Sequence, residues 1–167
     1  MRFYNLKKYI NLRRMKMRFF KKYSCIGALF LLFSSGAYAM EPVKSQYDFS
    51  TTLTKVKDSI LKRNIPIFAE FDFTSAAKNA KLELAPTKTI VFGNPKVGTF
   101  LMQENPNIAL ELPLKILVYQ DASYNVFIKT TDIKQLAKEY RIKNTKVVET
   151  ISNLLAEIVK ESSGKAK

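Results

Sequence analysis

The 167-residue sequence contains no histidine, no tryptophan and one cysteine. Without histidine, no imidazole can act as a general base near neutral pH or as a metal ligand. The single cysteine, Cys25, lies in an apolar run near the N-terminus. If that run is removed, disulfides, thiol nucleophiles and Cys/His zinc sites are all excluded. Gly-rich nucleotide loops, nucleophile elbows and metal-ligand spacings are also missing. We therefore predict no catalytic residues, no cofactor and no metal site.

Acidic residues are absent from residues 1–39, and this shapes the charge of the whole chain. The sequence has 28 Lys and Arg against 14 Asp and Glu, a net charge of +14, which is typical of nucleic-acid-binding proteins. Nine of the basic residues, however, precede Tyr23. Without them, 19 basic and 14 acidic residues remain, a net charge of +5. This ordinary surface balance predicts no nucleic-acid partner.

The basic segment is followed by the short apolar run Cys25–Phe33 and by Ala37-Tyr38-Ala39. A basic region, an apolar core and a small-x-small cleavage signal are typical of a secretory signal peptide. The run is shorter than the roughly 20 residues of a membrane-spanning helix. We therefore predict a signal peptide over 1–39, cleavage near Ala39, no stable membrane span, and a periplasmic or secreted protein.

Two alternatives concern this N-terminal segment. An uncleaved membrane anchor is the alternative to a signal peptide. The basic region is long for a signal peptide, so Met15 or Met17 could be the true start in place of Met1.

The remaining chain alternates between strand and helix patterns, which predicts one domain over 40–143 and a C-terminal amphipathic helix over 144–160. The predicted class is α+β, with a mostly antiparallel sheet and helices packed on one face. Ser50 is expected to cap the first helix. The tail 161–167 is predicted to be disordered. The predicted strands are 45–49, 67–73, 87–92, 112–120 and 124–130, and the predicted helices are 51–63, 74–81, 95–104, 132–140 and 144–160.

Alternating positions on these strands predict an open sheet face of mixed aromatic, aliphatic and charged side chains. Such a face is typical of an interface, here between two copies of the chain, although a half-solvated face of a monomer is an equal alternative. The predicted face consists of Phe68, Glu70, Asp72, Lys115, Leu117, Tyr119, Phe127 and Lys129.

Several short motifs, in this order, resemble the bacterial family called domain of unknown function 302. They are Phe71-Asp72, Leu82-Glu83-Leu84, Pro86-Thr87-Lys88, Phe92-Gly93-Asn94-Pro95-Lys96, Gly98-Thr99, Leu101-Met102-Gln103 and Ala109-Leu110-Glu111-Leu112-Pro113-Leu114-Lys115. The resemblance implies a TATA-binding-protein-like fold, with a curved antiparallel sheet backed by helices, often in a homodimer. It implies no established activity. Family members often have His after the Asp that Asp72 matches, whereas this chain has Phe73. The segment from Asn144 onward lies outside the resemblance.

The strand-to-helix corner at Phe92–Gln103 is the first candidate site. The N-terminus of the helix after Pro95 would present unpaired N–H groups to a small anion, beside Asn94, Lys96 and Thr99. Lys88 and Lys115 could add positive charge. The alternative is a structural turn in which Asn94 only caps the helix.

The second candidate is the carboxylate pair Glu70 and Asp72, because residues two apart on a strand project to one face. A hydrolase or lyase would need these carboxylates to meet a group such as Lys115 or Tyr119. Asp72 could instead cap the helix that follows it. We predict an exported, non-enzymatic domain that binds a small ligand or a protein partner, with the enzyme as the alternative.

Overall fold

The computed structural model describes residues 41–165 of the chain. The predicted signal peptide, its cleavage site and the alternative starts lie outside these residues. Within the described part, no helix combines the length and the apolar character needed to cross a membrane.

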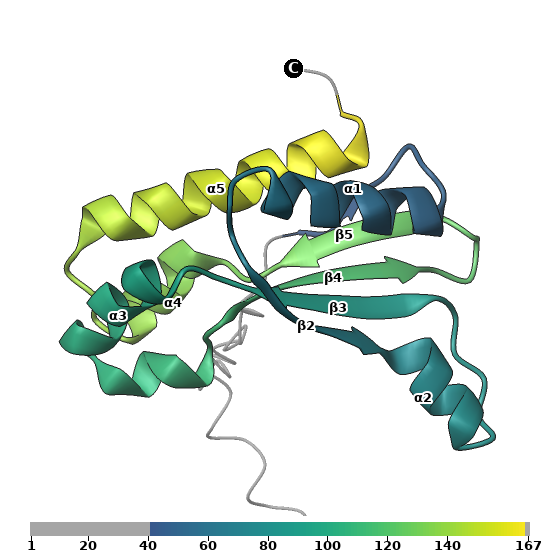
Figure 1. Cartoon of the computed structure of the whole chain (residues 1–167), viewed down its shortest axis with the longest axis horizontal. Coiled ribbons are helices and arrows are strands. Elements are labelled where there is room, and N and C mark those ends of the chain that lie inside the picture. The colour runs from purple at the N-terminus through teal and green to yellow at the C-terminus, as the bar shows by residue number, and fades with distance from the viewer. Residues whose placement is uncertain (1–40, 166–167) are drawn as a thin grey trace, which may run out of the picture. The chain divides into compact units, whose positions relative to one another are not determined.

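The described residues form an open five-stranded sheet in which every neighbouring pair of strands is antiparallel (Figure 1). The strands follow one another in the order β1-β5-β4-β3-β2. Their bounds are β1 Val43–Lys44, β2 Ile67–Asp72, β3 Thr87–Phe92, β4 Leu114–Gln120 and β5 Val126–Thr130. The edge strand predicted at 45–49 is wrong, because pairing with β5 ends at Lys44 and the first helix starts at Phe49.

Five α-helices and one 3₁₀-helix complete the described part of the fold, and α1 and α5 lie over the same face of the sheet (Figure 1). The predicted α+β class, with helices packed on one sheet face, is therefore confirmed. The bounds are α1 Phe49–Leu61, α2 Phe73–Asn79, α3 Pro95–Glu104, η1 Pro106–Leu110, α4 Ile133–Glu139 and α5 Thr145–Ser163.

Short polar side chains begin the helices by accepting hydrogen bonds from free backbone N–H groups. Asp48, rather than the predicted Ser50, caps α1: its carboxylate accepts from the Thr51 N–H at 2.8 Å, and the Ser50 hydroxyl itself donates to Asp48. A carboxylate two residues earlier thus takes the capping role. Asp72 caps α2, as the sequence suggested.

The core lies between the sheet and the two long helices α1 and α5. Fully buried side chains include Ile60 of α1, Ile116 of β4 and Leu155 of α5. The helix α5 continues to Ser163, and Ser162 and Ser163 are fully buried. The disordered tail predicted from residue 161 is therefore wrong over 161–163. The backbone N–H of Gln46 donates to the Ser163 carbonyl and holds this end against the start of the domain.

A register shift in β2 changes which of its residues face the helices. The regular pairing with β3 is interrupted between Ile67 and Ala69. Beyond this bulge, Glu70 pairs with the buried Ile90, so Glu70 and Asp72 lie on the helix-covered side of the sheet. The prediction that these two carboxylates lie on the open face is wrong. Phe71, paired with Thr89, takes their place there.

Candidate functional site

A cavity of about 570 Å³ lies at the corner where β3 leads into α3. Its wall is formed by the ends of β2 and β3, by α3, by the segment from η1 to β4, and by the middle of α5. Most lining side chains are apolar, among them Phe92, Met102 and Leu154. The cavity therefore suits the apolar part of a small molecule.

Two glycines of the predicted corner line this cavity. A Cβ on Gly93 would contact Phe68 at 3.6 Å, and a Cβ on Gly98 would contact Leu112 at 3.7 Å. These are ordinary contact distances, so a side chain as small as that of alanine would fit at either position without a steric clash. Their missing side chains instead leave space between α3 and the opposite wall.

The first turn of α3 has its backbone N–H groups occupied within the protein. Pro95 has no N–H, and Asn94 Oδ1 accepts from the Lys96 N–H at 3.0 Å. The Asn94 carbonyl accepts from the N–H groups of Val97 and Gly98, both at 3.0 Å. The contacts therefore support the structural alternative, a capped helix start, over an anion site.

Thr99 and Lys96 do not extend an anion site into the cavity. The Thr99 hydroxyl donates to the Pro95 carbonyl at 2.7 Å, one helical turn back. Lys96 and Thr99 are both exposed, and neither lines the cavity. Of the three corner residues predicted to bind a ligand, only Asn94 is part of the cavity wall.

Lys88 and Asp72 lie together at a different place, in an ion-pair cluster with Glu70 and Lys57. Lys88 Nζ lies 3.1 Å from Glu70 Oε1 and 3.2 Å from Asp72 Oδ2, and Lys57 Nζ lies 3.1 Å from Glu70. Hydrogen bonds from Lys57, and then from Lys88, lower the pKa of Glu70. The Ser75 backbone N–H and hydroxyl lower the pKa of Asp72. Carboxylates held ionised in this way are weak proton acceptors, which disfavours general acid/base chemistry.

Lys115 is separate from both groups. Its Nζ donates to the Glu111 carbonyl at 3.1 Å, and its strand position places it on the open sheet face. The structure therefore distributes the predicted site residues over three places: the start of α3, the ion-pair cluster and the open face.

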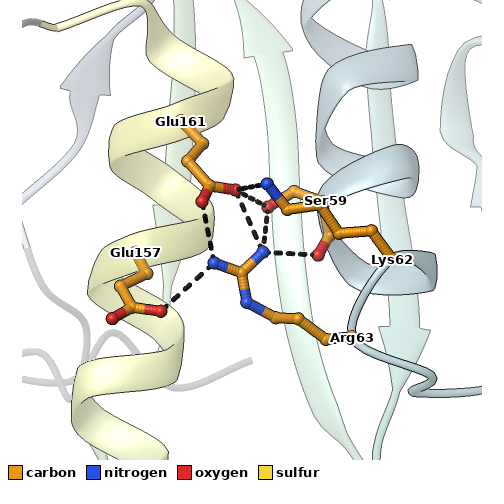
Figure 2. Close-up of polar contacts among 5 residues, drawn as sticks. All are labelled: Ser59, Lys62, Arg63, Glu157 and Glu161. Atoms are coloured by element: carbon orange, nitrogen blue, oxygen red, sulfur yellow. Dashed lines mark hydrogen bonds and ion pairs between the residues drawn. The ribbon is translucent and has the colours of Figure 1, made fainter.

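Sequence reasoning did not identify Arg63, the one charged residue in the lining of the cavity among the described residues. Figure 2 shows its guanidinium between Ser59 of α1 and two glutamates of α5. Arg63 donates to Glu161 at 2.9 and 3.0 Å, to Glu157 at 3.1 Å, and to the Ser59 carbonyl at 2.7 Å. Lys62 Nζ also pairs with Glu161, at 2.7 Å. The only sequence feature that pointed to this cluster was the spacing of Glu157 and Glu161, which places both carboxylates on one face of the helix.

The open face of the sheet carries the residues predicted from the central strands. Tyr119 and Phe127 are cross-strand partners whose rings stack at 5.4 Å between centroids. Phe71 remains 53% exposed. The face is thus partly aromatic, while its use as a homodimer interface stays a prediction.

An antiparallel sheet covered by helices on one side, with an apolar cavity at one corner, defines an α+β domain. The chain belongs to the family described as Domain of unknown function DUF302, which it matches over residues 42–158. The match includes most of α5, so the prediction that the chain leaves the family resemblance at Asn144 is wrong.

Two similar proteins are named as fluoride-specific ion channels, FluC 1 of Brucella suis and FluC 2 of Brucella melitensis. Each is 34% identical to this chain over 100 residues, which cover 60% of the chain. The chain spans 39% and 37% of their respective lengths, so most of each channel protein lies outside the match.

A solved structure also resembles the described fold. The crystal structure of an uncharacterized conserved DUF302 protein from Bacillus stearothermophilus superposes with a TM-score of 0.67 at 17% sequence identity. The similarity covers 76% of this chain and 99% of the other. It establishes the shared fold.

Proposed function

We propose that this chain is an exported, non-enzymatic domain that binds a small, largely apolar molecule in the cavity between α3 and α5. The observation that carries the proposal is the cavity itself. Its volume of about 570 Å³ falls within the range of roughly 300 to 1,000 Å³ for ligand pockets. Its apolar lining favours association through removal of apolar surface from water.

The polar groups in the cavity wall are suited to orient a bound ligand by hydrogen bonds rather than to catalyse a reaction. Asn94 uses its Oδ1 to cap α3, and no partner for its Nδ2 is found among the described residues. The Thr150 hydroxyl donates to the Lys146 carbonyl and keeps lone pairs free. Glu70 and Asp72 do not line the cavity. This separation is the reason to prefer binding over a hydrolase or lyase.

A fluorescence titration with N-phenyl-1-naphthylamine, an uncharged apolar probe, tests the proposal. We expect saturable binding to the purified protein. Gly98→Leu places a branched side chain against the cavity wall and should abolish binding, whereas Gly98→Ala adds only one methyl group and should retain it. Absence of saturable binding to the unmodified protein, or equal binding by Gly98→Leu, would refute the proposal.

Export is tested separately from binding. When the full-length chain is produced in a bacterial host, we expect the purified protein to begin at Met40, after cleavage behind Ala39. Intact-mass spectrometry on periplasmic and membrane fractions distinguishes this product from an uncleaved anchor, which would keep residues 1–39 and remain with the membrane.

Self-association through the open sheet face is a second candidate function, because this face carries the stacked rings of Tyr119 and Phe127 and, two strands away from Tyr119, the exposed Phe71. Light scattering should give the mass of a dimer, and Tyr119→Lys should give that of a monomer without loss of fold. A monomeric unmodified protein would exclude the interface.

The name of the Brucella relatives adds fluoride to the ligands worth testing. We expect no shift of the melting temperature with sodium fluoride beyond that with sodium chloride, because the N–H groups at the start of α3 already have partners. A fluoride-specific stabilisation would show that the domain itself binds the ion.

A further inference from the structure

Arg63 gives the apolar cavity a single charged group among the described lining residues, and that charge is already balanced. We propose that the cavity selects uncharged ligands, and that Glu157 and Glu161 are the residues that set this selectivity. The inference rests on the proposed function and specifies its ligand class. It also replaces the small anion expected from the sequence with a neutral molecule.

The contacts around Arg63 leave little of its guanidinium for a ligand. Its two terminal nitrogens donate to Glu157, to both carboxylate oxygens of Glu161, and to the carbonyl and hydroxyl of Ser59. The Arg63 side chain is only 18% exposed. Among the described residues only its Nε–H has no hydrogen-bond partner, so a ligand carboxylate could form a bidentate pair with Arg63 only by displacing one of these glutamates.

The cluster is also neutral as a whole. Lys62 and Arg63 supply two positive charges, and Glu157 and Glu161 supply two negative charges. Hydrogen bonds with Glu161, above all, raise the pKa of Arg63, and those from Arg63 lower the pKa of Glu161, so both stay ionised near neutral pH. An anion entering the cavity would lose its hydration without gaining an unpaired cation.

The start of α3, on the opposite wall, offers no free backbone N–H groups that could offset the lost hydration of an anion. Its first N–H groups are bonded to the Asn94 side chain and carbonyl. An uncharged ligand has no ionic hydration to lose and needs no unpaired cation. Apolar contact and one hydrogen bond to Asn94 Nδ2 or Thr150 are sufficient for it.

Two fluorescent probes that share one framework test this selectivity. N-Phenyl-1-naphthylamine is uncharged, and 8-anilino-1-naphthalenesulfonate carries the same two ring systems with an added sulfonate. We expect the purified protein to bind the sulfonate at least about tenfold more weakly than the neutral probe. Glu157→Gln removes one negative charge beside Arg63, and we expect it to lower this ratio several-fold while neutral-probe affinity stays unchanged.

Glu149→Gln is the matched control, because Glu149 lies on the same helix, pairs with Lys134 at 2.9 Å and does not line the cavity. It should leave the ratio of the two affinities unchanged. Should Glu157→Gln fail to fold, Glu161→Gln also removes one negative charge beside Arg63 and is expected to move the ratio in the same direction.

The outcomes separate this inference from the proposed function. If the neutral probe does not bind the unmodified protein, the proposed function fails. If both probes bind equally, or if Glu157→Gln and Glu149→Gln give the same ratio, the cavity still binds small molecules but the charge selectivity is wrong.

Discussion

Replacement of Arg63 by Met tests the connection between α1 and α5 beside the cavity. The substitution keeps an unbranched apolar stem of similar length and removes the guanidinium that Figure 2 shows between the helices. Glu161 then keeps Lys62 as a cationic partner, whereas Glu157 keeps none among the described residues.

The expected loss follows from the contacts and their exposure. The Glu157 side chain is 65% exposed, so its single contact with Arg63 is worth a few tenths of a kcal/mol. Glu161 is 39% exposed and contacts both terminal nitrogens, which places this pair near the upper end of about 1 kcal/mol for surface pairs. Loss of the bonds to the nearly buried Ser59 adds about 1 kcal/mol. We therefore expect Arg63→Met to lower the free energy of unfolding by about 2 kcal/mol.

Urea denaturation at several pH values measures this loss. Pairing lowers the pKa of Glu161 below its ordinary value of 4.5, so its stabilisation is present above that pH and is lost as the pH falls. The difference between the two proteins should therefore be constant near neutral pH and shrink below about pH 4.5. Lys134→Met, which breaks the exposed Lys134–Glu149 pair, should cost less than about 0.5 kcal/mol. An equally small loss for Arg63→Met, or one that does not change with pH, would refute the assigned network.

Three further substitutions, each followed by urea denaturation, test local structure. Gly98→Ala should stabilise the protein by about 0.5 to 1 kcal/mol, because Gly98 is helical and a Cβ fits there. A destabilisation would contradict the space that the structure leaves beside Gly98. Gly164→Ala should destabilise the protein by more than about 1 kcal/mol, because Gly164 has φ +73° and its Cβ would lie 2.8 Å from the Tyr47 ring. A neutral result would contradict the left-handed conformation of Gly164 at the end of α5 and its packing against Tyr47. Asn94→Ala should cost about 1 kcal/mol, as expected for a helix cap; no loss would contradict the cap.

The sequence predicted which residues of β4 and β5 face the helices, but it did not predict this for the interrupted strand β2. In β4, Leu117 and Tyr119 lie on the sheet face that points away from the helices, as the alternating pattern predicted. In β5, Phe127 and Lys129 lie on the same open face. In β2 the bulge between Ile67 and Ala69 reverses the alternation, and the carboxylates exchange faces with Phe71. No residue type in this segment marks the bulge, because it arises from pairing with β3.

The helix ends show which local signals were sufficient. Asn94 and Asp72 cap their helices, which the sequence offered as the structural alternative at both positions, because a capping side chain acts on residues two or three positions away. The end of α5 was also marked in the sequence: Gly164 adopts the left-handed conformation that ends a helix, directly after Ser163. The sequence nevertheless predicts a disordered tail here, because Ser162 and Ser163 are polar residues close to a chain terminus.

The candidate site depends on contacts between distant parts of the chain, which local patterns do not contain. Arg63 meets Glu161 across 98 positions, and the cavity wall combines residues from α3, β4 and α5. Sequence reasoning identified the β3–α3 corner as the place for a site. It selected charged neighbours such as Lys88 and Lys115, because charge is visible in a sequence and an apolar cavity is not.

A crystal structure of the protein with N-phenyl-1-naphthylamine tests the central claim most directly. We predict that the probe occupies the cavity, with its rings against Phe92, Met102 and Leu154, and that Arg63 keeps its contacts with both glutamates. A probe bound to the open sheet face, or a cavity closed by rearranged side chains, would contradict it.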